Sequence, residues 1–441
     1  MSTIAIVGGG AAGFFAAIAT KETSPNARVV IYERGSHVLA KVSISGGGRC
    51  NLTNSFQEIA DLKTAYPRGS KLMQRLFNRF DYRDTYQWFE EHGVPLIVQE
   101  DQCVFPKAQD SLVIINALVQ TAQRLGVEIK TQRTLTGIAY DNIHKSTISQ
   151  ESAYELSSIK DDLIENTAIP HGFVLSFKDR DPCRADFVIL TMGGQPHIGQ
   201  FDFLERMGQP ITQPVPSLFT LCISDPNLTA LMGTVVEASL SIPGTKLRSH
   251  GPLLITHWGL SGPATLKLSS YAARELYEAR YCMPISINWM GGENALSVSQ
   301  TLIDMQRQHP KKLMANTWPT SVSSRLWHYL LLRAGLTLDK PWCELGRKQL
   351  NRLSETLTND THQIVGKGKF KDEFVTCGGV SMSGIKPNTL ESKHLPGLFF
   401  AGELLDIDAV TGGFNLQAAW TTGRVAGEEA AKLSQKQVSD D

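Results

Sequence analysis

The N-terminal stretch up to Ala19 constrains the fold of this chain more than any other. An apolar run, Thr3-Ile4-Ala5-Ile6-Val7, leads directly into Gly8-Gly9-Gly10-Ala11-Ala12-Gly13 and then into an alanine-rich apolar segment. This order indicates a buried strand, a glycine turn with the spacing G-x-G-x-x-G, and a helix whose N-terminus faces an anion. The sequence therefore predicts a dinucleotide site, with its contacts at Gly8, Gly10, Ala12 and Gly13.

A second apolar run, residues 28–32, places this glycine turn in a larger motif. It ends at the candidate contacts Glu33 and Arg34, and Glu33 stands at the distance beyond Gly13 at which a carboxylate reaches ribose hydroxyls. A glycine pattern by itself is weak, because an ordinary turn has the same composition. The strand and the acid together favour dinucleotide binding.

Length and composition bound the class of protein. A chain of 441 residues is too long for one core and predicts two or three domains. Lys and Arg number 43, as do Asp and Glu, which disfavours nucleic acid or an anionic membrane as partner. Seven cysteines stand singly, without metal-ligand spacing, so we expect reduced thiols, no metal and a cytoplasmic location. No apolar run is long enough to span a membrane, and the N-terminus lacks the basic region of a signal peptide.

A second glycine-rich segment, residues 41–54, reads K-V-S-I-S-G-G-G-R-C-N-L-T-N. One interpretation is a flexible linker. The other is a loop whose glycine backbone lies flat against a cofactor while Arg49 and Asn51 supply hydrogen-bond donors. Cys50 has no partner in a C-x₄-C pair, because Ser55 stands at that position, so we expect packing or cofactor contact rather than thiol chemistry.

These motifs resemble a known group of flavoproteins. The glycine turn, the acid after the second strand and the G-G-x-R segment are similar to the glutathione-reductase superfamily of FAD proteins. The longer string resembles the BaiN-like family of bacterial flavoproteins, which includes aminoacetone-oxidase-type members. The resemblance implies FAD as the cofactor and adds the candidate contacts Lys41, Gly47, Gly48, Arg49, Cys50, Asn51 and Leu135.

The chain also departs from the family pattern. Cys103 stands where the family often has Arg before Val-Phe-Pro, and Thr191-Met192-Gly193 replaces the usual Ala-Thr-Gly, although the candidate contact Gly193 is retained. The segment from Gln195 to Gly208 is shorter than in many members, so we expect substrate access to differ.

The C-terminal region repeats the pattern of strand, glycine and acid. Residues 398–401 lead into Gly402 and Glu403, which suits a carboxylate directed at ribityl hydroxyls, although the superfamily usually has Asp there. A glycine pair then opens a helix, and the resemblance places its N-terminus at the flavin pyrimidine edge. The candidate contacts here are Gly413, Asn415 and Leu416, and the small residues Ala418, Ala419, Thr422 and Ala426 suit close packing on the sheet.

The expected fold class is α/β, a Rossmann-like FAD domain of glutathione-reductase type with an insertion. We assign residues 1–194 and 376–441 to the FAD domain. Short strands and Pro-Gly turns predict an inserted β domain, a barrel or small sheet, over 195–290 and 359–375. Amphipathic runs predict a helical subdomain over 291–358. Within the first domain we expect one helix over 70–93, a helix over 111–124 and a surface excursion over 141–170.

The expected activity is that of an FAD-dependent oxidoreductase that acts on a small organic substrate by hydride transfer at flavin N5. Amine or amino-ketone oxidation with oxygen and NAD(P)H-driven reduction of a double bond remain open. So do a flavin-bound redox sensor and a flavoenzyme of RNA modification. NAD(P)H would be a transient donor, because no second G-x-G-x-x-G follows Gly13 on its own strand and helix. His257, in a His-Trp-Gly turn similar to a family segment, is a candidate catalytic residue, although such a histidine is more often structural. The sequence leaves the oligomeric state open.

Overall fold

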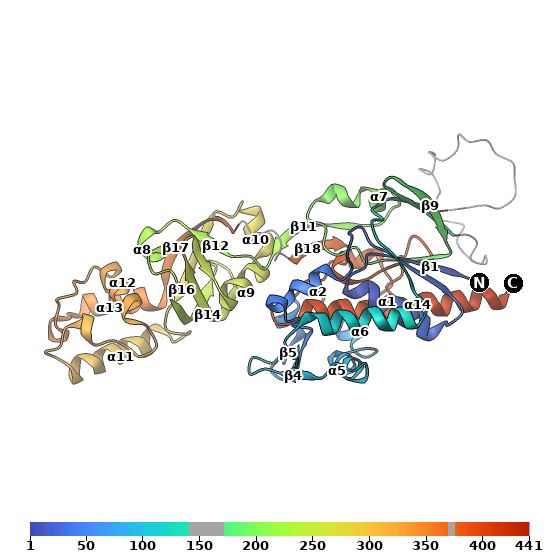
Figure 1. Cartoon of the computed structure of the whole chain (residues 1–441). Helices are drawn as coiled ribbons and strands as arrows, with labels where there is room; N and C mark the ends of the chain where they lie inside the picture. Colours follow the sequence, from blue (N-terminus) through green and yellow to red (C-terminus); the bar gives the residue numbers. More distant parts are fainter. Residues whose placement is uncertain (141–171, 369–374, 441) are drawn as a thin grey trace. The chain divides into compact units, whose positions relative to one another are not determined.

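The computed structural model describes residues 1–140, 172–368 and 375–440, so the excursion predicted over 141–170 lies outside the described residues. The chain divides into two compact units. The first comprises residues 1–214, 378–407 and 412–441, and the second comprises 215–377 and 408–411. The second unit is therefore inserted into the first, and Figure 1 shows the elements of each.

A parallel five-stranded sheet forms the centre of the first unit. Its strand order is β19 (Leu398–Phe400), β10 (Phe187–Leu190), β1 (Thr3–Val7), β2 (Arg28–Tyr32) and β6 (Glu128–Lys130). The strands β1 and β10, and β19 at one edge, are apolar and almost completely buried, as expected for a parallel sheet covered on both faces. The Rossmann-like fold predicted from the sequence is confirmed.

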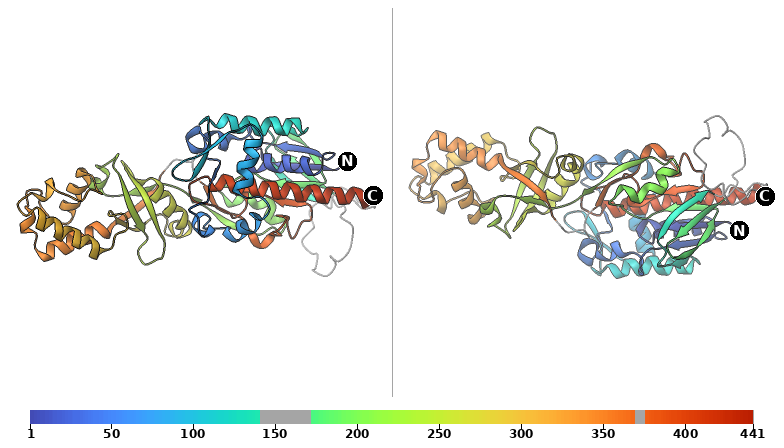
Figure 2. Two further views of the ribbon diagram at one scale, coloured as in Figure 1. Left: turned by 90° about the horizontal axis from the view of Figure 1, so that it is seen from below. Right: turned by 90° about the horizontal axis from the view of Figure 1, so that it is seen from above.

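Two helices that are far apart in sequence lie side by side against this sheet. The helix α1 (Ala11–Thr23) follows β1, and α14 (Phe414–Asp440) runs along it (Figures 1 and 2). An ideal Cβ at Gly423 would lie 2.4 Å from the carbonyl oxygen of Ala12, and one at Gly427 would lie 2.3 Å from that of Ala16. Other small residues of α14 were predicted to pack on the sheet. The contact of Gly423 and Gly427 with α1 was not predicted from the sequence.

The helix expected over 70–93 is wrong in one respect, because the structure has two helices there. The helix α4 (Ser70–Leu76) ends before residue 77, and α5 (Tyr82–Glu91) begins at a capping box. The Asp81 carboxylate accepts from the N–H groups of Arg83 and Asp84, and the Asp84 carboxylate accepts from the Asp81 N–H. Such a box satisfies the free N–H groups of a new helix start, so it interrupts the apolar periodicity.

The other elements complete the first unit. In chain order they are α2 (Ala40–Ile44), the 3-10 helix η1 (Ser45–Gly48), β3 (Thr53–Asn54), α3 (Leu62–Ala65), β4 (Leu96–Val98), β5 (Cys103–Pro106), α6 (Ser111–Arg124), β7 (Leu135–Tyr140), β8 (Phe173–Phe177), β9 (Arg180–Ala185), η2 (Ile198–Phe201), α7 (Asp202–Arg206), η5 (Met382–Gly384) and η6 (Gly402–Leu404). The helix α6 has the predicted bounds. The paired strands β11 (Ile211–Ser217) and β18 (Val375–Val380) cross the boundary between the units.

The second unit is built on a closed six-stranded barrel. Around it the strands follow the order β12 (Leu221–Ile223), β15 (Gly259–Ser261), β14 (Arg248–Thr256), β13 (Val235–Ser241), β16 (Met283–Asn288) and β17 (Asp360–Lys367). Its helices are α8 (Pro226–Thr229), α9 (Pro263–Tyr271), α10 (Ala273–Glu278), α11 (Ala295–Gln308), η3 (Met314–Asn316), α12 (Ser324–Arg333), η4 (Trp342–Glu344) and α13 (Arg347–Thr358). Closure of the barrel removes the exposed strand edges that a small sheet would leave.

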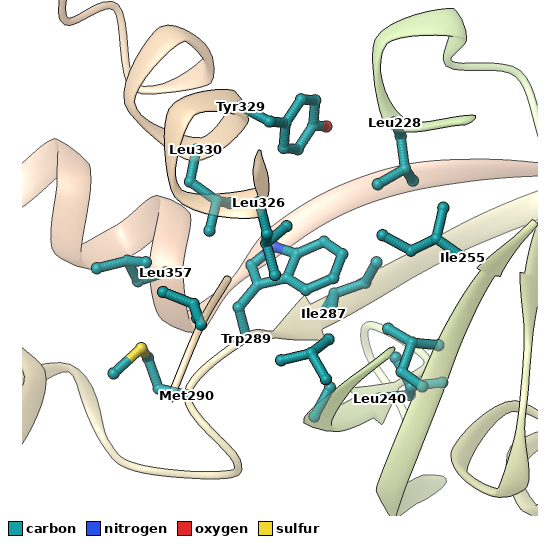
Figure 3. Close-up of a cluster of buried hydrophobic side chains, with 14 of the residues drawn as sticks. Leu228, Leu240, Ile255, Ile287, Trp289, Met290, Leu326, Tyr329, Leu330 and Leu357 are labelled. Carbon is teal, nitrogen blue, oxygen red and sulfur yellow. The ribbon is translucent and has the colours of Figure 1, made fainter. Parts of the chain in front are cut away.

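One core joins the barrel to the helices of this unit. Trp289, at the end of β16, is fully buried between barrel residues such as Ile287 and helix residues such as Leu326 and Leu330 (Figure 3). Its indole N–H donates to Asp360, which also pairs with Arg333 of α12 and His362 of β17. Apolar packing and a buried ionic group therefore both hold the helices to the barrel.

The described residues contain neither a helix suited to a membrane nor a group of side chains suited to a metal ion. Within 1–140, 172–368 and 375–440, no helix is both long and apolar enough to cross a membrane. The same residues contain no cluster of His, Cys, Asp and Glu that could bind a metal ion. All seven cysteines are free thiols.

Candidate cofactor-binding site

The three motif glycines of the N-terminal turn have different surroundings. Gly8 has φ +115°, and an ideal Cβ there would lie 2.3 Å from the Thr191 carbonyl oxygen; at Gly13 it would lie 2.0 Å from the Gly8 carbonyl oxygen. At Gly10, by contrast, no heavy atom lies within 4 Å of an ideal Cβ. Gly8 and Gly13 thus serve backbone packing, and open space remains beside Gly10 at the N-terminus of α1. That space and the helix dipole fit a pyrophosphate.

Glu33 ties two backbone turns together beside this space. Its Oε2 accepts from the Gly9 N–H and its Oε1 from the Gly35 N–H, each at 2.7 Å. Next to Glu33 lies a pocket of about 370 Å³, within the range of small-molecule sites. Four predicted contacts line it together, namely Gly8, Glu33, Arg34 and Leu135.

Part of the lining of this pocket was not predicted from the sequence. The segment that follows the return strand β10 contributes Gln195, Phe203 and Arg206 to its lining, and Arg133 completes one side. One signal of it is visible in the sequence, the shortness of the segment from Gln195 to Gly208, from which we expected a change in substrate access. In the structure this segment instead lines the pocket that suits the adenosine part of a dinucleotide.

We predict that Glu33→Ala lowers FAD affinity by about 10- to 150-fold, since a hydrogen bond to a charged group contributes roughly 1.5–3 kcal/mol. The loss of the bonds to Gly9 and Gly35 would loosen the turn as well. Titration of the apoprotein with FAD, followed by flavin fluorescence, measures the effect. An affinity equal to that of the unmodified protein would mean that another group holds the ribose.

The glycine loop at 45–51 has a left-handed backbone that leaves one side open. Gly46, Gly47 and Gly48 have φ values of +57°, +69° and +84°. An ideal Cβ at Gly46 would collide with Asn51 and Phe105, whereas at Gly47 nothing lies within 4 Å. The open side fits a planar ring laid against the backbone. The exposed Arg49 places its guanidinium over the Phe105 ring, 4.4 Å from the ring centroid.

Hydrogen bonds join this loop to the start of α14. With its amide oriented to satisfy both groups, Asn51 donates to the Thr53 carbonyl (2.9 Å) and accepts from the Gly413 N–H (3.3 Å). The Trp420 indole N–H donates to the Leu52 carbonyl (2.8 Å), and buried Gln417 bonds to Thr53 and Thr85. The predicted loop and helix, more than 350 residues apart in sequence, therefore form one rigid element.

A third group of predicted residues meets between the N-terminal turn and the C-terminal strand. The Lys41 ammonium lies 2.6 Å from Oε2 of Glu403. That oxygen is also 4.0 Å from the ideal Cβ of Gly193, and an ideal Cβ at Gly402 would lie 2.8 Å from Ala12. Asn415 and Leu416 stand half-buried in the first turn of α14. The contact of Glu403 with ribityl hydroxyls stays a prediction.

Cys50 is fully buried in the glycine loop, and burial raises its pKa to about 12. At pH 8 only about one thiol in ten thousand would be ionised, and the thiolate is the reactive form. We therefore predict that iodoacetamide at pH 8 labels the exposed Cys282 and Cys343 and leaves Cys50 unmodified. Peptide mass spectrometry after labelling of the folded protein measures this. Labelling of Cys50 at the rate of Cys282 would contradict the assigned burial.

His257 and these residues belong to different units. It lies exposed in the turn between β14 and β15, with its ring centroid 4.3 Å from that of Trp258, and it belongs to the second unit. The cofactor contacts described above all belong to the first unit. A catalytic role for His257 stays a prediction.

The fold and the site together define the class of this protein. Open space at the glycine turn, a carboxylate beside a pocket, and a glycine loop bonded to a C-terminal helix start fit FAD, whose contacts would come from two separate sequence segments. The protein is an FAD-dependent oxidoreductase with a Rossmann-type cofactor domain.

Comparison with known proteins identifies the family. The model of the HI0933-like protein Rossmann domain matches residues 2–429, and the chain belongs to this family. The chain is 26% identical over 445 residues to 3-dehydro-bile acid delta(4,6)-reductase of Clostridium scindens, covering 98% of this chain and 100% of the relative. It is 27% identical over 442 residues to the ribosomal RNA dihydrouridine synthase of Escherichia coli, covering 97% and 98%.

A solved structure agrees at the level of the fold. The 3-ketosteroid-delta4-(5alpha)-dehydrogenase of Rhodococcus jostii superposes with a TM-score of 0.50 at 14% identity, over 98% of this chain and 96% of the other. The family membership predicted from the motifs at 4–13 and 41–54 is confirmed, as is FAD as the cofactor.

Proposed function

We propose that this protein is a reductase that adds hydrogen across a carbon–carbon double bond conjugated to a carbonyl group. One observation carries the proposal. The full-length relatives named above have unrelated substrates, a bile acid and a ribosomal RNA, yet both names describe saturation of a ring double bond. Shared chemistry on different substrates is the expectation when the cofactor performs the reaction and the protein selects the substrate.

The residues of the first unit would supply binding and orientation. Bound FAD supplies hydride transfer from its N5 atom. The turn at Gly10 and the carboxylate of Glu33 would hold the pyrophosphate and ribose, and the paired Lys41 and Glu403 would contact the ribityl chain. The loop at 45–51 would support the ring system on its open side. The first turn of α14 would favour negative charge at the adjacent ring edge, by at most about 2 kcal/mol.

We predict weak binding of the electron donor. The nearest candidate for a second nucleotide turn, Gly366-Lys367-Gly368, lies at the end of barrel strand β17 and so is no phosphate turn. NADH or NADPH would then have few phosphate contacts, with half-saturation at or above about 0.1 mM, the upper part of the usual range. Anaerobic stopped-flow reduction over a range of both nucleotides measures this. Saturation at low micromolar concentration would reveal a nucleotide site elsewhere.

The proposed reaction is tested by anaerobic turnover with three substrates. The purified protein, reduced by NADPH, is mixed with a 4-ene-3-ketosteroid, a uridine-containing RNA or a small primary amine. Reoxidation of the flavin by the steroid or the RNA, with two hydrogens gained in the product mass, supports the proposal. If the oxidised protein is instead reduced by the amine, and neither double-bond substrate reacts, the protein is an amine oxidase.

Uridine in RNA is the second candidate substrate. A further full-length relative, from Haemophilus influenzae, is also named ribosomal RNA dihydrouridine synthase, at 24% identity over 95% of this chain. This supports RNA as a second candidate, although the neutral charge balance of the whole chain disfavours nucleic acid. A cytoplasmic location would suit such a substrate, and seven free thiols suit a reducing compartment.

A further inference from the structure

The two units carry opposite net charges, although the whole chain is neutral. The second unit holds 17 Lys and Arg against 13 Asp and Glu, which leaves 26 against 30 for the first. The surplus lies in residues 291–358, the helical region, with nine Lys and Arg against five Asp and Glu. The neutral balance that disfavoured nucleic acid therefore conceals a basic region.

The tertiary structure gathers cations of this region from two segments, 307–312 at the end of α11 and 340–348 at the start of α13. Backbone N–H groups of Trp342 and Cys343 donate to the carbonyls of Lys312 (3.0 Å) and Pro310 (2.8 Å), and the Gln306 amide donates to the Leu345 carbonyl (2.9 Å). We call the surface of these two segments the basic edge. Its cations are Arg307, Lys311, Lys312, Lys340, Arg347 and Lys348.

Most of this charge is not neutralised by neighbours. Arg307 lies 3.8 Å from Asp304, and Lys340 lies 3.9 Å from Glu344. Within the part of the chain that the structure describes, Lys311, Lys312, Arg347 and Lys348 form no salt bridge, and all four are exposed. Glu344 is the one carboxylate within these two segments, and Asp304 and Asp339 lie just outside them, so the basic edge keeps a positive net charge.

Two of these cations do not serve the stability of their own helix. Arg347 and Lys348 are the first two residues of α13, which has no acidic residue in its first turn. The positive end of the helix dipole lies there, so a cation destabilises the helix at a position where an acid would stabilise it. A solvated surface would be expected to place its cations at the other end of the helix.

We propose that the basic edge binds the phosphate backbone of RNA and so presents RNA as the macromolecular substrate of this enzyme. The inference rests on the RNA form of the proposed function. Exposed Lys and Arg that neutralise phosphates release counterions, which gives affinity without sequence preference. The residues at the cofactor site would then recognise the target uridine.

The test is RNA binding by a variant in which Lys311, Lys312, Arg347 and Lys348 are all changed to Ala. Affinity of the FAD-loaded protein for a fluorescent uridine-containing RNA hairpin is measured by anisotropy between 50 and 200 mM KCl, without NADPH. Each phosphate contact adds about one unit to the slope of log affinity against log salt. We expect the variant to lose at least about tenfold in affinity at 100 mM KCl and about three units of slope.

A matched variant controls for the loss of charge alone. Lys71, Lys107, Arg124 and Lys178 are exposed residues of the first unit with the same composition, and their change to Ala should leave affinity and slope unchanged. Equal losses in both variants, or no binding by the unmodified protein at 50 mM KCl, would overturn the proposal. So would binding to phosphatidylglycerol vesicles but not to RNA.

The same proteins separate this inference from the proposed reaction. Both variants should retain FAD and reduce the 4-ene-3-ketosteroid, if that substrate is accepted, at the unmodified rate. If the basic-edge variant loses RNA binding and none of the proteins reduces a double bond in any substrate, the proposed reaction is refuted and the RNA-binding surface is supported. If the basic-edge variant binds and reduces RNA as well as the unmodified protein does, the RNA-binding role of the basic edge is refuted and the proposed reaction is supported.

Discussion

Gly10→Val is expected to give a folded protein that contains no FAD. The Gly10 backbone is extended, with φ −93° and ψ −168°, which any residue adopts, and an ideal Cβ there has no heavy atom within 4 Å. A Cβ at this position would therefore meet no protein atom, and the valine branches would extend into the space that fits the pyrophosphate. We expect FAD affinity to fall at least about a hundredfold, or about 2.7 kcal/mol. The flavin absorbance of the purified protein and titration of its apo form measure this.

Gly13→Val is the matched control, because it tests packing instead of the ligand. A Cβ at Gly13 would lie 2.0 Å from the Gly8 carbonyl oxygen, so this variant should fail to fold even when FAD is supplied. The apo form of Gly10→Val, in contrast, should unfold at the temperature of the unmodified apo protein. A yellow Gly10→Val protein with full FAD content would contradict the assignment of the N-terminal turn as the pyrophosphate site.

Gly427→Val is expected to cost about 3 kcal/mol of the stability of the first unit. Its Cβ would lie 2.3 Å from the Ala16 carbonyl oxygen, and a backbone atom within α1 cannot move aside as a side chain could. Overpacking typically costs 1–3 kcal/mol, and a clash with backbone belongs at the upper end. For a unit of this size the midpoint temperature of thermal unfolding should fall by about 6–12 °C.

Thermal release of FAD, followed by flavin fluorescence, reports on the first unit alone. Gly346→Ala is the control, because Gly346 caps α13 in the second unit with no heavy atom within 4 Å of its ideal Cβ. That change should leave the release temperature of FAD unchanged. A release temperature for Gly427→Val within about 2 °C of the unmodified protein would show that α1 and α14 separate at little cost.

Local sequence patterns predicted the cofactor half of this protein well. The order of strand, glycine turn and helix at 3–19 is short-range, and so is the glycine loop at 45–48, since each needs only neighbouring residues. The same holds for α6, whose bounds were predicted from its apolar spacing. Where a local signal competes with periodicity, the prediction was wrong, as at Asp81, whose capping box starts α5 within an apolar repeat.

The sequence by itself thus determined the Rossmann-type fold and FAD, because a phosphate turn is encoded in adjacent residues with fixed backbone demands. Only the tertiary structure decided which distant segments meet. It placed Gly427 against Ala16, the segment after Gln195 over the pocket beside Glu33, and Lys312 beside Trp342. Contacts of this kind join segments that are far apart in the sequence. The spacing of residues along the chain does not show which distant segments will meet when the long loops between them close.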